Sequence, residues 1–312
     1  MLAIILALAS AIGYGGSDFA AGLASRTASV IQVTLLACVA ACLLVLAALP
    51  FAASPGPSGA ALAWGAVAGA SGTLGGIALY LGFRYAAFSV AAPLSAVGTA
   101  GFSVLAGLLW GERPSTLALT GIALALPAII GVSASAGERV SAGAGEGDQA
   151  VSAGADDAGR ETGEGGSPGP AGRPAAGVAA GLIAGACFAL LLIGLDRAGS
   201  GSGLWPAAAA EVAELAVAVT AAALTRNLRL PRGRPGWLSL FTGVTGAAGT
   251  VCYFYASHHG LLAVVAVLTS LYPASTIVLA RITLGERLTG LRLAGLVLAG
   301  ACVALIAVGG AG

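Results

Sequence analysis

Ten apolar runs make up most of this chain. Each is about 20 residues long, the length that a helix needs to cross roughly 30 Å of hydrocarbon. They lie at residues 2–24, 29–51, 60–83, 87–110 and 115–134, and again at 175–195, 204–224, 236–257, 260–284 and 289–309. Because backbone groups in a bilayer must find partners within their own segment, these runs are predicted to be helices rather than strands.

The composition agrees with a lipid bilayer as the main surroundings. Hydrophobic residues make up 58% of the chain and charged residues only 9%, whereas a soluble domain carries about a quarter charged residues. The net charge of +1 gives no reason to expect a nucleic-acid partner. All charged basic residues are Arg, a usage that, with the many Ala and Gly residues, is typical of GC-rich bacterial coding.

An internal repeat relates the two sets of runs. Residues 72–131, moved along the chain by 174 positions, fall on residues 246–305, and 17 of the 60 pairs are identical. The matches include the run Gly111-Glu112-Arg113 on Gly285-Glu286-Arg287. Such a long period in membrane sequence is typical of carriers built from two homologous bundles. Because five spans is an odd number, we predict ten transmembrane helices as two inverted five-helix repeats.

The segment between the two sets of runs differs in composition. Residues 135–174 are rich in Gly, Ala, Ser and acidic residues and contain no aromatic residue. Such a segment cannot bury enough apolar surface to offset the entropy of ordering it. We therefore expect a first repeat at 1–134, a flexible acidic linker at 135–174 and a second repeat at 175–312. The first run lacks a preceding basic segment, so we interpret it as a helix rather than a cleaved signal peptide.

The cysteines give no sign of a metal or disulfide site. They lie inside apolar runs and show no CxxC spacing, at Cys38, Cys42, Cys187, Cys252 and Cys302. A zinc site or a disulfide framework needs clustered ligands near loops. We predict small apolar filler residues and no cofactor.

The first run carries a short pattern that supports a family resemblance. It reads Tyr14-Gly15-Gly16-Ser17-Asp18-Phe19. Together with the repeat, the helix count and the Gly-Glu-Arg runs, it resembles the EamA family of the drug/metabolite transporter superfamily. The pattern departs from the family in having Tyr for the usual Trp and Asp for Asn or Ser, and the second half keeps only Phe188 of it.

This resemblance, which covers all but the linker, implies a secondary carrier for a small-molecule solute. It places a central cavity between the first, third, fourth, sixth, eighth and ninth helices, and it leaves the substrate open. It also implies that both termini are cytoplasmic. The Arg residues, however, gather in the loops after odd-numbered helices, which favours termini outside. The orientation therefore stays open.

Polar residues within the spans are the first candidates for the site, because burying them in a bilayer is costly. Asp18 lies roughly 10 Å inside the end of the first helix at 1.5 Å per residue, and Tyr14 and Ser17 precede it. Proton coupling or cation binding is one reading of Asp18. A structural ion pair with Arg84 or Arg26 is the other.

Aromatic and hydroxyl side chains give the candidate cavity wall. These residues are Tyr80 in the third run and, before Pro273 in the ninth run, Thr269, Ser270 and Tyr272. Such groups suit a wall for an amphipathic solute, although aromatic residues also form belts at the membrane surface. Arg84, at the end of the third run, completes this first set of candidates.

Three further polar residues form a second set. Glu211 and Glu214 are three positions apart and so share one helix face, which does not point at lipid. The resemblance places their helix, the seventh, at the periphery. His258 aligns with Arg84 in the repeat, and it either titrates near neutral pH or is simply a solvated loop residue. Glu112 is expected either to cap the next helix or to form a gating ion pair.

These features and the resemblance together predict a secondary transporter for a small organic metabolite or drug-like solute in a bacterial plasma (inner) membrane, with proton coupling as one option, and no enzyme activity. The alternatives are an intramembrane enzyme and a non-transporting membrane scaffold. The ten predicted spans contain neither HExxH nor GxSxG, which an intramembrane enzyme of the common hydrolase types would need. Whether two copies associate as a homodimer stays open.

Overall fold

The computed structural model describes residues 1–52, 56–85, 88–134, 174–284 and 289–309. Within these ranges every regular element is a helix, and no strand is present. The first half of the chain forms α1 (Leu2–Ala24), α2 (Val30–Ala48), α3 (Gly59–Tyr85), α4 (Phe88–Leu109) and α5 (Thr116–Ala134). The second forms α7 (Pro174–Arg197), α8 (Trp205–Leu224), α9 (Arg234–Ser257), α10 (Leu262–Thr269), α11 (Tyr272–Leu284) and α12 (Gly290–Gly309), and short 3-10 turns follow α2 (Leu49–Phe51) and precede α8 (Ser200–Ser202).

The long helices have the length and composition of membrane spans. In the described part of the chain, seven segments are long and apolar enough to cross a membrane, and α10 with α11 counts as one of them, at Leu262–Thr283. Two further apolar helical segments are shorter, at Leu94–Leu109 and Thr116–Gly131. The prediction of an all-α, multi-pass membrane protein is confirmed.

The predicted ninth helix is broken near its middle. The run expected at 260–284 forms α10 up to Thr269 and α11 from Tyr272. Pro273 has no N–H and therefore cannot donate to the carbonyl group of Thr269 four residues earlier. The chain tightens at the break instead, where Leu271 N–H donates to the Leu268 carbonyl at 3.2 Å.

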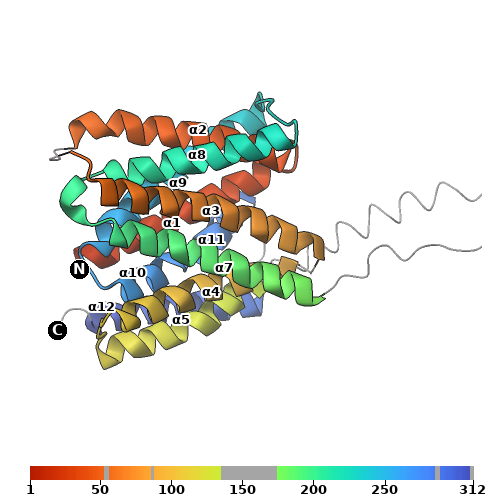
Figure 1. The fold of residues 1–312 in the computed structure, drawn as a ribbon. Coiled ribbons are helices and arrows are strands. Elements are labelled where there is room, and N and C mark those ends of the chain that lie inside the picture. Colours follow the sequence, from red (N-terminus) through yellow and green to blue (C-terminus); the bar gives the residue numbers. More distant parts are fainter. Residues whose placement is uncertain (53–55, 86–87, 135–173, 285–288, 310–312) are drawn as a thin grey trace, which may run out of the picture.

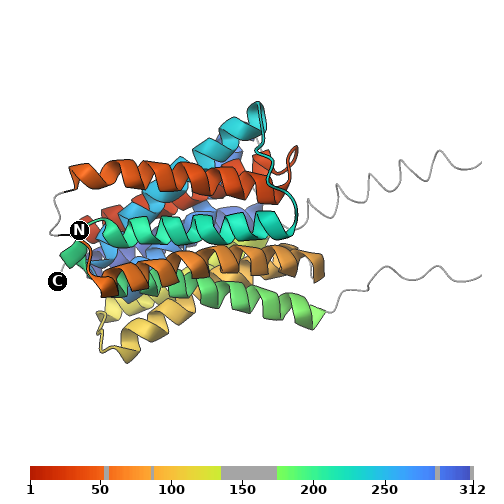
Figure 2. The ribbon, with the colours of Figure 1, turned by 45° about the horizontal axis from the view of Figure 1, so that its top comes forward.

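Helices of the two halves pack against one another rather than forming separate bundles. In Figures 1 and 2, α2 and α8 run side by side, α1 lies on α9, α3 lies on α7, and α5 lies on α12. The packing has a reciprocal pattern, because α1 also contacts α11 and α7 also contacts α4. Most interhelix contacts therefore join a helix of the first half to a helix of the second half.

Glycines allow close approach at several of these interfaces. A side chain at Gly69 would collide with the backbone carbonyl of Ala210 across the α3–α8 contact, and one at Gly243 would collide with the carbonyl of Ala37 across the α2–α9 contact. In lipid, helices associate through such small-residue contacts because hydrophobic burial between them gains little. Gly76 differs, since nothing lies within 4 Å of the position where its side chain would begin.

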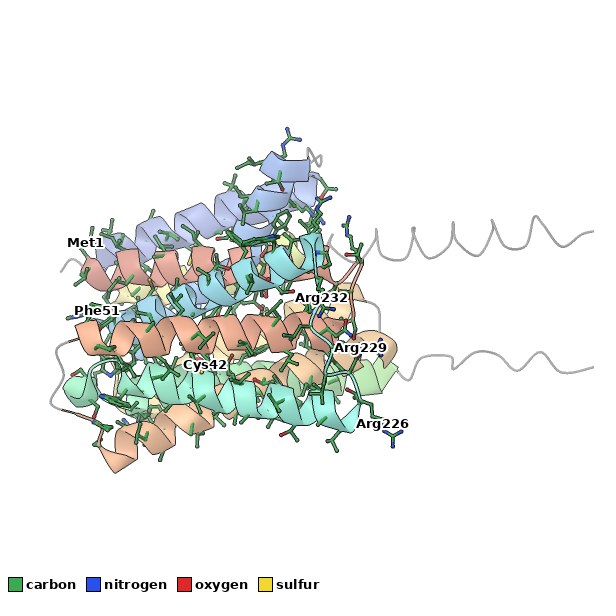
Figure 3. The ribbon with its side chains drawn as sticks, turned by 90° about the horizontal axis from the view of Figure 1, so that it is seen from above. Met1, Cys42, Phe51, Arg226, Arg229 and Arg232 are labelled. Atoms are coloured by element: carbon green, nitrogen blue, oxygen red, sulfur yellow. The ribbon has the colours of Figure 1, made fainter. Side chains whose placement is uncertain are left out.

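The two ends of the bundle differ in charge. Figure 3 shows Arg226, Arg229 and Arg232 at one end, which we call the arginine end, and Met1 and Phe51 at the opposite end, which we call the terminal end. The start of α1 and the end of α12 both lie at the terminal end (Figure 1). Cys42 lies between the two ends, along α2.

Candidate functional site

A cavity of about 350 Å³ lies among α1, α2, α3, α7, α8, α9 and the break between α10 and α11, with one contribution from α4. Its volume is within the range of small-molecule sites. Most of its lining is apolar or small, and hydroxyl and carboxyl groups are set among these residues. It is thus an amphipathic chamber inside a bundle of apolar helices.

The cavity reaches one end of the bundle only. Its lining residues include Ala21, Val30 and Ala221, each of which lies within about one turn of its helix terminus at the arginine end. Toward the terminal end, α1 contributes nothing before Tyr14 and α8 nothing before Glu211 among the described residues. The cavity therefore extends toward the arginine end and is closed at the terminal end.

Most of the sequence-predicted site residues face this one cavity. The structure brings together residues from α1, α8 and the α10–α11 break, namely Tyr14, Ser17, Asp18, Glu211, Glu214, Thr269, Ser270 and Tyr272. The side chains of Tyr80 and Arg84 lie outside the described residues, so the structure does not place them. His258 is described and does not line the cavity.

The cavity-facing part of α1 is fixed to the second half of the chain. The hydroxyl groups of Tyr14 and Thr250 are hydrogen-bonded at 3.2 Å, and the Thr276 hydroxyl donates to the Gly15 carbonyl at 3.1 Å. Gly15 packs directly on α11, because a side chain there would collide with the Tyr272 carbonyl. These contacts hold α1 in one register against α9 and α11.

Asp18 lies within α1 and is nevertheless exposed, because its side chain borders the cavity. No ion pair joins it to Arg26 in the part of the chain that the structure describes. The other partner considered from sequence, Arg84, has a side chain outside that part. A carboxylate that is accessible from the cavity and unpaired with Arg26 keeps the proton-coupling and cation-binding readings of Asp18 open.

The expected peripheral position of the seventh helix is wrong, because α8 forms one wall of the cavity. Its contacts with α2 and α3 turn Glu211 and Glu214 inward. Glu211 is only 2% exposed. Glu214 shares the space above Gly72 with Leu191, because an added side chain there would collide with Leu191 and would meet the Oε1 atom of Glu214 at 3.1 Å. The glycine in α3 thus makes room for side chains from both α7 and α8.

The helix break places two buried hydroxyl groups in the wall. Thr269 and Ser270 are 2% and 1% exposed, respectively. Both residues line the cavity, and neither hydroxyl has a hydrogen-bond partner within the described part of the chain. A buried hydroxyl without a partner is costly, so a molecule in the cavity that hydrogen-bonds to these groups would recover that cost.

The cavity has a one-sided charge. Its described lining residues include three acids, Asp18, Glu211 and Glu214, and no Arg, Lys or His. The carboxyl group of Glu211 interacts with the hydroxyl of Thr250, which also bonds to Tyr14. Hydroxyl groups are therefore the polar partners that the described wall offers to Glu211, and no positive charge balances it there.

The terminal end is held by contacts between the two halves. The carboxylate of Glu112 accepts hydrogen bonds from the first residues of α10, and the guanidinium of Arg197 stacks over the ring of Trp110 at 4.3 Å. The expected cap is wrong in its partner, because Glu112 caps a helix of the other half rather than the next helix in sequence. The gating ion pair stays a prediction, since Arg287 lies outside the described residues.

His258 belongs to this closed end and not to the cavity. Its Nδ1 atom lies 2.6 Å from the Phe254 carbonyl oxygen, and the centroid of its ring lies 4.5 Å from that of the Phe254 ring. It is partly buried rather than a freely solvated loop residue. Burial lowers the pKa of His258 below its ordinary value of 6.5, so the side chain is neutral at pH 7.

Sequence reasoning missed the contribution of α2 to the wall, and it missed the threonines of α9, although the resemblance placed this eighth helix at the cavity. Thr34 and Cys38 of α2 line the cavity, as do Thr242 and Thr250 of α9. The α2 sequence is apolar on all sides and carries no signal for such a face. In α9, hydroxyl residues recur beside glycines, and this spacing was the available clue.

The fold and cavity define an all-α, multi-pass membrane protein, and the comparisons specify its family. The model of the EamA-like transporter family matches residues 1–134 and again residues 175–308. The chain therefore belongs to the EamA-like transporter family. No curated protein matches it. A solved structure described as "Crystal structure of protein" shares 14% identity over 95% of both chains, with a TM-score of 0.67. At that identity, the likeness concerns the fold alone.

Proposed function

We propose that this protein is a secondary transporter that moves a small organic solute across a bacterial plasma membrane by alternating access. The cavity carries the proposal, because a polar-lined chamber that reaches one end of an apolar bundle is what one state of such a carrier needs. Family membership supports the same activity. No nucleotide or metal is part of the proposed cycle.

Two inverted five-helix repeats would supply the second state. The family model matches each half separately, and the interhelix contacts are reciprocal, with α1 on α9 matched by α7 on α3. In an inverted repeat, exchanging the conformations of the two halves closes one end and opens the other. We therefore propose ten spans, with α10 and α11 together forming the ninth.

The arginine end is proposed to face the cytoplasm. Four Arg residues lie between α8 and the first residue of α9, at Arg226, Arg229, Arg232 and Arg234, and positive loops stay on the cytoplasmic side. The cavity then extends inward in this conformation. A membrane-impermeant maleimide should label Arg229→Cys in inverted vesicles and not in intact cells, and the opposite labelling would reverse the assignment.

Transport is tested with purified protein in liposomes. A thermal-shift screen of the detergent-solubilised protein against a metabolite library identifies ligands, because binding to the folded state raises Tm. Each radiolabelled ligand is then followed into proteoliposomes without ATP. Saturable flux and exchange for internal ligand are expected. Flux that appears only with an added ATPase subunit would make the chain a permease of a primary pump and overturn the proposal.

Asp18 is proposed to couple transport to protons. Asp18→Asn keeps the shape and hydrogen-bonding groups of the side chain but removes its titration. Ligand binding and equilibrium exchange should persist, while accumulation driven by a pH gradient is lost. Asp196→Asn, which changes a carboxyl group that does not line the cavity, is the matched control. Gradient-driven accumulation at the wild-type level in well-folded Asp18→Asn protein would exclude the coupling role.

A further inference from the structure

The charge and hydrogen-bonding groups of the cavity identify a class of solute. We propose that the cavity binds a small organic cation, whose ammonium group lies against Glu211 and Glu214 and whose opposite end hydrogen-bonds to Thr269 and Ser270. The inference deepens the proposed transport function by naming the class of substrate. It rests on the arrangement of these four side chains around one chamber.

The α8 wall supplies the negative charge. Glu211 and Glu214 are one turn apart on the same helix face, and both border the cavity. A buried carboxylate needs an opposite charge or a proton to offset its lost hydration. The described lining residues provide no basic side chain for this purpose. A cationic solute would supply the missing charge from within the cavity.

The break between α10 and α11 supplies the second, independent observation. Thr269 and Ser270 are almost fully buried and border the cavity, and their hydroxyl groups have no hydrogen-bond partner among the residues that the structure describes. Two adjacent unpartnered hydroxyls are unusual in a folded protein, where buried polar groups are nearly always paired. A hydroxyl, carbonyl or amine on the solute would satisfy them.

The rest of the wall suits an aromatic or other flat apolar body. Tyr14, Phe188 and Tyr272 contribute rings to the cavity, and ring faces attract both aromatic groups and cations. Gly76 leaves room in the same cavity, because nothing lies within 4 Å of the position where its side chain would begin. An ammonium group on an aromatic body with a distal hydroxyl therefore matches all three parts of the chamber.

A set of ligands that share one skeleton tests the charge preference. Tyramine is a cation, tyrosol carries a neutral hydroxyl in place of the ammonium, and 4-hydroxyphenylacetate is an anion. Binding to the purified, full-length protein is measured by isothermal titration calorimetry. We expect tyramine to bind about tenfold or more tightly than tyrosol, and the anion to bind weakest. Equal or tighter binding of tyrosol or of the anion overturns the proposal, as does no binding of tyramine at millimolar concentration.

Variants assign the two ends of the solute. Glu211→Gln/Glu214→Gln should remove the preference for tyramine over tyrosol, and Glu214→Gln alone should reduce it, whereas Asp196→Asn should leave it unchanged. Phenethylamine lacks the phenol hydroxyl, so it should bind more weakly than tyramine. Thr269→Val/Ser270→Ala should abolish that difference. A tyramine preference that survives in the folded double Gln variant contradicts the placement of the ammonium group.

This experiment is separable from the test of transport. Tyramine binding with the predicted charge order but without flux of any ligand would leave the inference intact and remove the transport function. Flux of a neutral or anionic ligand, with no preference for the cation in binding, would support the transport function and overturn the inference about the cationic solute. Carboxyl groups that are simply protonated in the cavity would give equal affinities for tyramine and tyrosol.

Discussion

The carboxylate of Glu112 accepts a hydrogen bond from the backbone N–H of Leu262 at 2.6 Å, although the two residues are 150 positions apart. Its second oxygen accepts one from the N–H of Ala263 at 2.9 Å. The first N–H groups of a helix have no partner within it, so Glu112 satisfies two of them for α10. A turn of the first half thereby closes on a helix of the second half at the terminal end.

Removing this cap should loosen the closed end. Glu112→Ala leaves the first N–H groups of α10 without a partner, and the loss of a helix cap costs about 0.5–2 kcal/mol. We expect a lower Tm in detergent, measured by tryptophan fluorescence. Arg113→Ala is the matched control, because Arg113 is exposed beside the same turn. An equal decrease in both variants would contradict the role of the cap.

Close packing of α3 on α8 should tolerate no side chain at Gly69. A methyl group there would collide with the Ala210 carbonyl, and overpacking of this kind costs about 1–3 kcal/mol. Gly69→Ala should therefore lower Tm and reduce the yield of monodisperse protein in size-exclusion chromatography. Gly22→Ala, in α1 with nothing within 4 Å of the added group, should behave as wild type. A normal Gly69→Ala protein would refute this contact.

Filling the cavity should remove ligand binding without unfolding the bundle. Gly76 lines the cavity and has open space where its side chain would begin. Gly76→Leu should keep the wild-type Tm in the absence of ligand, yet lose the ligand-induced rise in Tm. Gly22→Leu tests the effect of the same change outside the cavity. A ligand-induced rise that is retained in Gly76→Leu would place the binding site elsewhere.

Acid should weaken the terminal end through His258. Burial lowers its pKa from 6.5, so the unfolded chain takes up the proton first as the pH falls through that value. Stability is then fully present above about pH 6.5 and decreases below it. When the pH is lowered from about 7.5 to about 5.5, the Tm of His258→Asn should decrease less than that of the wild type.

The exposed neighbour His259 supplies the control for this titration. His259→Asn should keep the wild-type decrease in Tm, because its side chain is solvated. Asp196, whose backbone lies near the His258 ring, is present in all of these proteins, so its own effect on the pH dependence of Tm is common to them. If His258→Asn and His259→Asn show the same pH dependence, the buried imidazole does not set it.

The sequence alone predicted the helices well because a bilayer leaves the backbone few choices. Runs of apolar residues marked nearly every helix, and the Arg and Pro clusters marked turns such as that before α9. The cavity residues on α1 and at the α10–α11 break were also predicted, since a hydroxyl or carboxyl group inside a span is rarely placed against lipid. Asp18 and Ser270 are examples, and both line the cavity.

What the sequence could not supply was the pairing of helices between the two halves. That pairing, rather than any local pattern, turns Glu211 toward the cavity and brings Glu112 to Leu262. The break after Thr269 was also not predicted as a helix end, because a proline within an apolar run can kink a helix without ending it. Tertiary packing decides these features, and a single chain carries no direct signal for them.

The broken ninth span has a mechanical consequence. Thr269 and Ser270 lie at the junction of α10 and α11. The cavity wall therefore includes the residues at which the angle between these two helices would change if the break acted as a hinge. Small changes of backbone angle at element ends are how hinges operate. We expect a solute that contacts this junction to bind one interhelix angle better than another and so to shift the population toward it. Occupancy of the cavity and the angle between α10 and α11 would then be linked directly.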